Sequence, residues 1–346
     1  MFDLEKLKDK RVAIVGGAGF IGHNLALKLK ELGAEPHVID GLQVNNIGYY
    51  TSDYEKNVNA ERYIAFINER LSLLRKAKIN LKIIDVRDYH DISNTIDEIN
   101  PEVVVHLAAI AHANRSNKDP FSTFDHSMRT LENVLDITRS KGIHVIYFSS
   151  SMVYGNFDGE AVTEDRVCNP MGIYGALKYG AEKLVIGYNQ VFDLPYTIIR
   201  PSALYGERCV SRRVGQAFIE NAITGKDLTV NGDGKEGLDF TYIDDLVQGI
   251  ILSIIKSESI NQIFNITFGA ARSINQLAKI VMTKFPGIKL HHKSRDGLMP
   301  ERGTLSIVKA QKLLGYNPQH PVEKGFVQYI NWYQYFAENN PQLFKK

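Results

Sequence analysis

Short apolar runs alternate with amphipathic segments over the first 200 residues of this 346-residue chain. The apolar runs have strand length and predict buried strands, whereas segments with apolar residues at every third or fourth position predict helices. The predicted strands are 11–16, 36–40, 80–84, 102–107, 143–149 and 196–199, and the predicted helices between them cover about 20–32, 60–78, 89–99, 121–141 and 174–192. This alternation predicts an α/β fold, a doubly wound parallel sheet with helices on both faces.

The pattern changes after Pro201, where the apolar runs become shorter. Ser273 and Gln276 have the spacing of a capping box at the start of a helix. We therefore expect a smaller C-terminal α/β lobe over 201–346, some segments of which return to the sheet formed by residues 1–200. Its predicted strands are 228–230 and 262–265, and its predicted helices cover about 211–224, 243–256 and 273–285.

The first predicted strand leads into a Gly-x-x-Gly-x-x-Gly turn made by Gly16, Gly19 and Gly22. Gly16 allows a tight turn, Gly19 allows the backbone to approach a pyrophosphate, and Gly22 allows the helix to pack closely on the strand. Exposed N–H groups and the helix dipole then attract phosphate. Between a strand and a helix, this motif predicts a dinucleotide site in a Rossmann-like sheet.

Asp40 ends the second predicted strand and indicates which dinucleotide binds. A carboxylate there accepts hydrogen bonds from both ribose hydroxyls and repels the extra phosphate of NADP, so NAD is favoured. The alternative interpretation is an aspartate that only caps a turn. The polar and aromatic segment 42–60 that follows is expected to be a long loop beside the cofactor or substrate.

Composition limits the other classes of function. The 41 basic and 39 acidic residues give a net charge of +2, which argues against nucleic acid or an anionic membrane as the main partner. The two cysteines, Cys168 and Cys209, have no metal-ligand spacing, so neither a metal site nor a disulfide framework is expected. The N-terminus is charged and lacks a signal-peptide pattern, and we expect a cytoplasmic protein.

Candidate chemistry lies at and after the fifth predicted strand, which ends in Ser149, Ser150 and Ser151. The carboxyl ends of strands hold the ligands of doubly wound sheets. Tyr174 and Lys178 are four residues apart on a predicted helix and share a face. A nearby cation favours the phenolate over the phenol, so Lys178 is expected to make Tyr174 a usable general base.

With these motifs the chain resembles the extended short-chain dehydrogenase/reductases, in the branch of NAD-dependent nucleotide-sugar epimerases and dehydratases. The resemblance covers nearly the whole chain. It implies that Ser150 hydrogen-bonds the 4-hydroxyl of the sugar, that Tyr174 removes its proton, and that Lys178 also binds the nicotinamide ribose. The cofactor-binding residues that it implies are Gly16, Gly19, Phe20, Ile21, Gly22, Asp40, Asp85, Val86, Leu107, Ala108, Ala109, Tyr174 and Lys178.

The positions after Ser150 bear on which reaction is catalysed. Sugar dehydratases of this branch carry Asp-Glu there and decarboxylases a glutamate at the second position, whereas this chain has Ser151 and Met152. Methionine cannot transfer protons. We therefore expect a nucleotide-sugar epimerase that acts at carbon 4 through a 4-keto intermediate. A 4,6-dehydratase, a decarboxylase, a net carbon-4 dehydrogenase and a non-catalytic NAD-binding regulator remain alternatives.

The chain also departs from the branch at substrate-binding positions. Leu238 replaces an arginine that grips the pyrophosphate of the substrate, and Ala203 and His126 replace asparagines. Ser151, Arg213 and Arg302 are the candidate substrate-binding residues, and Arg208 and Arg212 are further cations. Lesser candidates for acid–base chemistry are Cys168, Cys209, His112 and Ser116, whereas His106 is expected to be a buried structural histidine.

The resemblance also implies a partner. The helices at 121–141 and 174–192 match those that pair in dimers of this branch, and the second carries Leu184, Ile186, Tyr188 and Val191. We expect a homodimer. Residues 1–200 would form the NAD-binding domain, and 201–346 a nucleotide-sugar-binding lobe.

Overall fold

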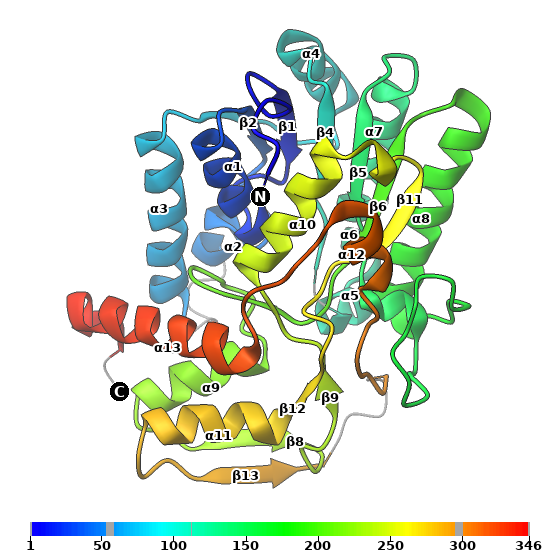
Figure 1. Cartoon of the computed structure of the whole chain (residues 1–346). Coiled ribbons are helices and arrows are strands. Elements are labelled where there is room, and N and C mark those ends of the chain that lie inside the picture. Colours follow the sequence, from blue (N-terminus) through cyan, green and yellow to red (C-terminus); the bar gives the residue numbers. More distant parts are fainter. Residues whose placement is uncertain (1, 53–58, 112, 295–299, 345–346) are drawn as a thin grey trace.

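Seven parallel strands form one sheet, in the order β11-β6-β5-β4-β1-β2-β3 (Figure 1). The structure is a computed structural model that describes residues 2–52, 59–111, 113–294 and 300–344. The strands are β1 Arg11–Val15, β2 Glu35–Asp40, β3 Asn80–Ile83, β4 Val103–His106, β5 His144–Phe148, β6 Tyr196–Arg200 and β11 Gln262–Asn265. This is a Rossmann-like doubly wound sheet whose strand order reverses between β1 and β4. The predicted fold class is confirmed, and the six N-terminal strands lie within one residue of their predicted bounds.

Helices cover both faces of the sheet because alternate residues of each strand point to opposite faces. Val12 and Ile14 of β1 pack in one apolar cluster with α1, α3 and α10, whereas Ala13 and Val15 pack in another with α4 and α7. The α8 helix covers the same face farther along, over β5 and β6. These helices are α1 Phe20–Glu31, α3 Ala60–Lys76, α4 Tyr89–Ile99, α7 Thr130–Thr138, α8 Gly172–Phe192 and α10 Ile243–Ile255 (Figure 1).

Two segments differ from their predicted structure. The expected long helix 121–141 is divided into α6 Pro120–Phe124, a π-helical turn Asp125–Arg129, and α7. The expected loop 42–60 contains a helix, α2 Ile47–Ser52, and its residues 53–58 lie outside the described residues. Helix α2 forms because Tyr50 is buried against Tyr63 and its hydroxyl donates to the Val210 carbonyl at 2.7 Å.

The C-terminal part builds a small lobe below the carboxyl ends of the sheet and also contributes β11 to the sheet itself (Figure 1). The capping box of Ser273 and Gln276 is present. Helix α9 begins at Val214, so 211–213 belongs to a loop rather than to the predicted helix. The lobe and the remaining connections contain β7 Leu204–Tyr205, β8 Leu228–Asn231, β9 Gly237–Leu238, β10 Thr241–Tyr242, β12 Arg272–Ser273, β13 Leu290–Lys293, α5 Ala113–Lys118, α9 Val214–Ile223, α11 Ile274–Lys284, α12 Val308–Leu314 and α13 Val322–Asn339.

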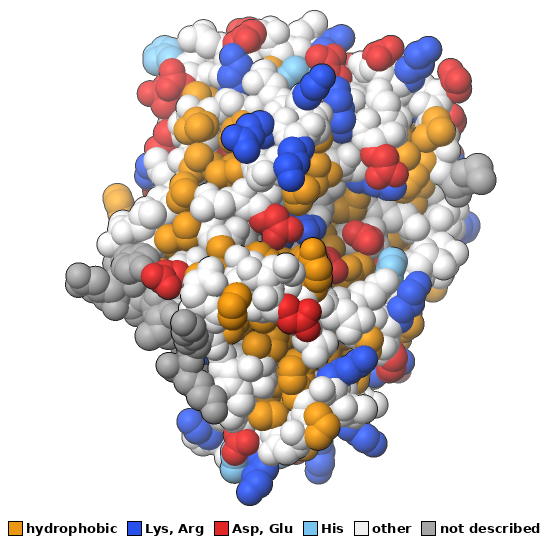
Figure 2. Space-filling view, turned by 90° about the vertical axis from the view of Figure 1, so that its left-hand side faces the viewer, with side chains coloured by type: hydrophobic (Ala, Val, Ile, Leu, Met, Phe, Trp, Pro, Cys, Tyr) orange, Lys and Arg blue, Asp and Glu red, His pale blue; other side chains and the backbone are white. Residues whose placement is uncertain are grey.

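The small strands pair as β7 with β10, β8 with β13, and β9 with β12. Figure 2 faces the side that carries α3 and α13, and there acidic and basic side chains are interspersed. This distribution agrees with the small net charge of +2.

Within the described residues, no helix is both long and apolar enough to cross a membrane. The division of the chain at residue 200 stays a prediction.

Candidate active site

A cavity of about 660 Å³ lies at the carboxyl ends of the central strands, between the sheet and the small lobe. Ligands of doubly wound sheets bind at this place, where the strand order reverses. The main catalytic, cofactor-binding and substrate-binding candidates from the sequence all line it: Gly16, Gly19, Phe20, Ile21, Gly22, Asp40, Asp85, Val86, Leu107, Ala108, Ala109, Ser150, Ser151, Tyr174, Lys178, Arg213 and Arg302. The structure thus brings the candidate cofactor, catalytic and substrate residues to one cavity.

The glycine turn after β1 has no room for side chains. Gly16 has a φ of +81°, and a Cβ there would lie 2.7 Å from the Ala108 nitrogen. A Cβ on Gly22 would lie 2.4 Å from the Gly17 Cα. Helix α1 therefore begins directly behind the turn and points its N-terminus at the cavity, which suits a phosphate group.

Two carboxylates line the cavity, Asp40 at the end of β2 and Asp85 after β3. Asp40 accepts from the backbone nitrogens of Ala18 at 2.9 Å and Leu42 at 2.7 Å, so it caps a turn and also lines the cavity. Burial raises the pKa of Asp40. Hydrogen bonds from Arg87 lower the pKa of Asp85 to about 2. Each carboxylate oxygen has two lone pairs, so Asp40 can still accept from ribose hydroxyls.

Ser150 and Tyr174 meet at the end of β5. The Ser150 hydroxyl accepts from the Met152 nitrogen at 3.2 Å and caps a 3-10 helix, Ser151–Tyr154. Burial is the largest effect and raises the pKa of Tyr174 above its ordinary value, although the charge of Arg213 and a hydrogen bond to Ser150 act in the opposite direction. The cation that favours the phenolate in this structure is thus Arg213.

Lys178 lies on α8 with Tyr174 and lines the same cavity. Its ammonium donates to the Phe148 carbonyl at 2.6 Å and lies 5.0 Å from the centre of the Tyr147 ring. Burial lowers its pKa to about 8, against the charge of Glu182. The effect of Lys178 on the pKa of Tyr174 stays a prediction.

A buried network below these residues was missed by the sequence analysis. Arg200 donates to Glu182 at 2.9 and 2.6 Å and to the Tyr154 hydroxyl at 2.9 Å. Ser149 donates to the same carboxylate, and Tyr154 donates to Asn265 at 2.8 Å. The network joins β5, α8, β6 and β11. One signal was available, since Glu182 is four residues after Lys178 and shares its helix face.

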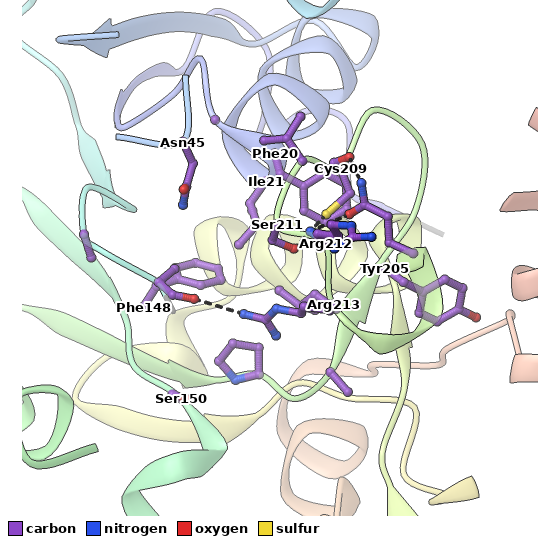
Figure 3. A pocket seen from close by; sticks show the side chains of 18 of the residues that line it. Phe20, Ile21, Asn45, Phe148, Ser150, Tyr205, Cys209, Ser211, Arg212 and Arg213 are labelled. Carbon is purple, nitrogen blue, oxygen red and sulfur yellow. Dashed lines mark hydrogen bonds between the residues drawn. The ribbon is translucent and has the colours of Figure 1, made fainter. Parts of the chain in front are cut away.

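The four candidate arginines after β7 have different surroundings. Arg208 points away from the cavity and donates to His23 at 3.1 Å, so it is not a lining residue. Arg212 lines the cavity and pairs with Glu220 at 3.3 Å, and Arg302 lies 3.7 Å from Glu236. Arg213 extends into the cavity toward the end of β5 (Figure 3) and donates to the Ala111 carbonyl at 3.2 Å.

The lesser candidates for acid–base chemistry also differ in whether they line the cavity. Cys209 lines the cavity beside Ser211, whereas Cys168 and Ser116 do not line it. His106 is buried, as predicted, and burial lowers its pKa to about 3, so it stays neutral. His112 lies outside the described residues.

Arg70 is a lining residue without any sequence signal. It lies on α3, which was predicted only as a helix, and its contact with the cavity depends on how α3 packs in the fold.

The chain is similar to known proteins over nearly its whole length. The chain is 29% identical over 330 residues to a putative UDP-glucose 4-epimerase of Methanocaldococcus jannaschii, with 93% of this chain and 97% of the relative covered. It is 25% identical over 358 residues to dTDP-glucose 4,6-dehydratase of Haemophilus influenzae, with 95% and 99% covered.

A solved structure of UDP-glucuronic acid 4-epimerase from Bacillus cereus, in complex with UDP-glucuronic acid and NAD, has the same fold. Its TM-score is 0.82 at 24% identity, and 94% of this chain and 99% of that chain are covered. The sequence profile of the NAD-dependent epimerase/dehydratase family matches residues 12–267. The chain therefore belongs to the NAD-dependent epimerase/dehydratase family, and its cofactor is NAD.

Proposed function

We propose that the protein is a nucleotide-sugar epimerase that acts at carbon 4 through a 4-keto intermediate. The observation that carries this proposal is Met152, which lines the cavity beside Ser150 and Ser151 where related dehydratases have a carboxylic acid. Among the described lining residues, the carboxylates are Asp40, Asp85 and Glu236. Asp40 and Asp85 belong to the adenosine end, and Glu236 is 3.7 Å from Arg302. Among the described lining residues, elimination of water would therefore have no free carboxylic acid beside the sugar to donate the proton.

We assign the cofactor to the glycine turn. A Cβ on Gly16 or Gly22 would clash with neighbouring backbone, so the glycines keep the turn compact, and the start of α1 faces the cavity. Asp40 would accept from the ribose hydroxyls, and Asp85 and Val86 would contact adenine. When bound there, NAD would supply the acceptor for the carbon-4 hydride. Lys178 would bind the nicotinamide ribose while its ammonium remains held by the Phe148 carbonyl.

Tyr174 is assigned to remove the proton of the sugar 4-hydroxyl. The phenolate accepts this proton as carbon 4 is oxidised, and Ser150 holds the hydroxyl in line. Arg213 stabilises the phenolate by its charge, so Tyr174 loses its own proton at a lower pH than it would without Arg213. Return of the hydride to the other face of the ketone inverts the centre, and Tyr174 gives the proton back.

Substrate binding is assigned to Ser151, Arg213 and Arg302. Guanidinium groups bind phosphate oxygens with two parallel hydrogen bonds. With Leu238 in place of the usual arginine, Arg302 is placed to take over because it lies beside Glu236, two residues before Leu238. Arg213 serves the sugar end, since it extends into the cavity toward the end of β5 (Figure 3).

The product decides between the reactions. The purified protein is incubated with UDP-, GDP-, CDP- and dTDP-sugars, and products are followed by NMR and mass spectrometry. An epimer of unchanged mass is expected. A loss of 18 mass units would indicate dehydration, a loss of 44 decarboxylation, and a loss of two net oxidation. Release of NADP instead of NAD on denaturation would contradict the role of Asp40.

We also propose a homodimer through α6 and α8. Phe121 and Phe124 of α6 and Val191 and Phe192 of α8 are exposed apolar side chains on neighbouring helices. Leu184, Ile186 and Tyr188 are partly buried against the sheet core, so the exposed set differs from the stripe predicted from the sequence. A monomer in light scattering at micromolar concentration would contradict this proposal.

A further inference from the structure

Helix α3 carries two buried arginines, eight residues apart, that are bonded in the same way. Arg62 donates to the Leu343 carbonyl from Nε at 3.3 Å and from Nη2 at 2.9 Å. Arg70 donates to the Arg208 carbonyl from Nε at 3.0 Å and also from Nη2. Each thus ties α3 to a backbone segment far away in the sequence.

The two arginines differ in the surroundings of their third guanidinium nitrogen, Nη1. Nη1 of Arg62 donates to Asn59 at 3.3 Å and lies 3.8 Å from Glu220. Nη1 of Arg70 has no hydrogen-bond partner among the described residues, although Arg70 is 0% exposed. Buried donors are almost always paired, so this one indicates a partner outside the described residues.

The position of Arg70 indicates what that partner is. Arg70 lines the cavity together with Gly16, Gly19 and Asp40, whereas Arg62 does not line it. Burial lowers the pKa of Arg70 to about 10, so the side chain remains charged at neutral pH. Asp40 acts on Arg70 by its charge, but Nη1 of Arg70 makes no hydrogen bond to it. A cation beside a helix N-terminus that binds phosphate suits an anionic ligand.

We propose that Arg70 is a cofactor-binding residue whose Nη1 donates to the pyrophosphate of NAD, and that its other two nitrogens tie this contact to the substrate loop. The substrate loop is 206–213, which carries Arg213. The proposal rests on NAD as cofactor and holds for any of the sugar reactions considered above.

The link to the substrate loop has a structural basis. Arg208, whose carbonyl Arg70 holds, has a φ of +62°, a conformation that non-glycine residues rarely adopt. Cys209, Ser211 and Arg213 follow it in the loop and line the cavity. Loss of Arg70 therefore removes a hydrogen bond to the cofactor and also releases the segment that positions Arg213.

The test compares Arg70→Gln and Arg70→Lys with Arg62→Gln, the matched variant on the same helix. Nucleotide released on denaturation gives the NAD carried per chain. Isothermal titration of nucleotide-free protein gives affinities for ADP-ribose and for adenosine, which lacks the phosphates. Hydrogen exchange reports on the substrate loop.

Arg70→Gln is expected to lower the NAD carried per chain and to weaken ADP-ribose binding by about 10- to 100-fold, with adenosine binding unchanged. Arg70→Lys keeps the charge and retains more of the affinity. Exchange in 206–213 rises in Arg70→Gln only. Arg62→Gln keeps the affinity for ADP-ribose even if its melting temperature falls.

Wild-type affinity of Arg70→Gln for ADP-ribose would overturn the proposal. Equal loss of adenosine and ADP-ribose binding would also overturn it, because Arg70 would then act through Asp40 or through the fold. Unchanged exchange in 206–213 would remove the link to the substrate loop.

Discussion

The two ends of the active-site cavity are built in different ways. At the cofactor end, the backbone of Gly16, Gly19 and Gly22 and the short side chain of Asp40 form the surface, and all belong to β1, α1 and β2 or the turn between them. At the substrate end, long side chains project from 203–213, a segment with φ of +38° at Ala203. The first end is fixed by regular structure and the second by side-chain contacts.

The contacts that hold the substrate end come from distant helices. Tyr50 of α2 donates to the Val210 carbonyl at 2.7 Å, and Gln216 of α9 donates to the Cys209 carbonyl at 2.9 Å. The Gln216 side chain also accepts from the Arg212 nitrogen at 2.8 Å. Substitutions at the cofactor end should therefore disturb the fold and the cofactor together, whereas those at the substrate end should alter the substrate step with NAD still bound.

The largest effect is expected where the two ends meet, at Tyr174. Tyr174→Phe removes the phenol but keeps the ring, so turnover should fall by ~10²–10⁴-fold. NAD content and melting temperature should stay unchanged. The control is Tyr179→Phe, five residues later on α8, where Tyr179 packs with Phe157 and Val162 outside the cavity. Equal turnover of Tyr174→Phe and wild type would assign the base to another group.

Gly22→Ala is expected to break the cofactor end. The new Cβ would lie within 2.4–2.7 Å of backbone atoms of Gly17, which no side-chain rotation can relieve. Overpacking of this kind costs about 1–3 kcal/mol. The urea midpoint and the NAD released per chain should both fall.

Gly237→Ala is the matched change at the substrate end. A Cβ there meets the Ala271 Cβ at an ordinary 3.4 Å. NAD content should be unchanged, and stability should change by less than about 0.5 kcal/mol. If Gly22→Ala retained its NAD and its urea midpoint, the backbone would not define the cofactor end.

Arg213→Gln is expected to affect the substrate end alone. Loss of a charge-assisted hydrogen bond should raise KM by about 10- to 100-fold. Because the charge of Arg213 lowers the pKa of Tyr174, its removal should move the rise of kcat to higher pH. Arg213→Lys restores the charge and should restore the pH profile in part. Initial rates from pH 6 to pH 9 measure both effects. An unshifted pH profile would show that the charge of Arg213 does not act on Tyr174.

The same difference explains what the sequence could predict. The β1 strand, the glycine turn and α1 are contiguous in the sequence, so the spacing of their residues determines their structure. Helix 89–99 was likewise predicted at its observed bounds. Candidate residues tied to strand ends, such as Asp40 and Ser150, were brought to the cavity because parallel strands end at one edge of a sheet.

The substrate end could not be predicted to the same degree. Arg208 and Arg213 are five residues apart in one loop, yet Arg208 turns to His23 and Arg213 enters the cavity. Left-handed backbone at Arg208 and Arg212 redirects the chain, and no residue type in the segment indicates it. Arg70 shows the same limit, since its contact with the cavity follows from the packing of α3 and not from a motif.

The smallest effect is expected at Asp239, below the substrate end, and it concerns stability against pH. The carboxylate is fully buried and accepts from Thr267, Gly269 and Leu305, each at 3.1 Å. Burial raises its pKa from the ordinary 3.8 to about 6. The folded state then binds more protons than the unfolded state between about pH 4 and pH 6, so the free energy of unfolding falls as pH rises through this window and levels off above it. Between pH 5 and pH 7 this group should remove about 1 kcal/mol.

Urea unfolding at several pH values measures how steeply the free energy of unfolding changes with pH. This slope isolates the contribution of Asp239 better than the free energy of unfolding at one pH. Asp239→Asn loses an acceptor and should be less stable throughout, but its slope in this window should be flatter than that of the wild type. An equal slope in both proteins would show that Asp239 is ionised in the folded state at pH 5. The ionised carboxylate would then hold 267–269 and Leu305 by charge, and the lobe beneath the substrate end would depend on a buried charge as the sheet does at Glu182 and Arg200.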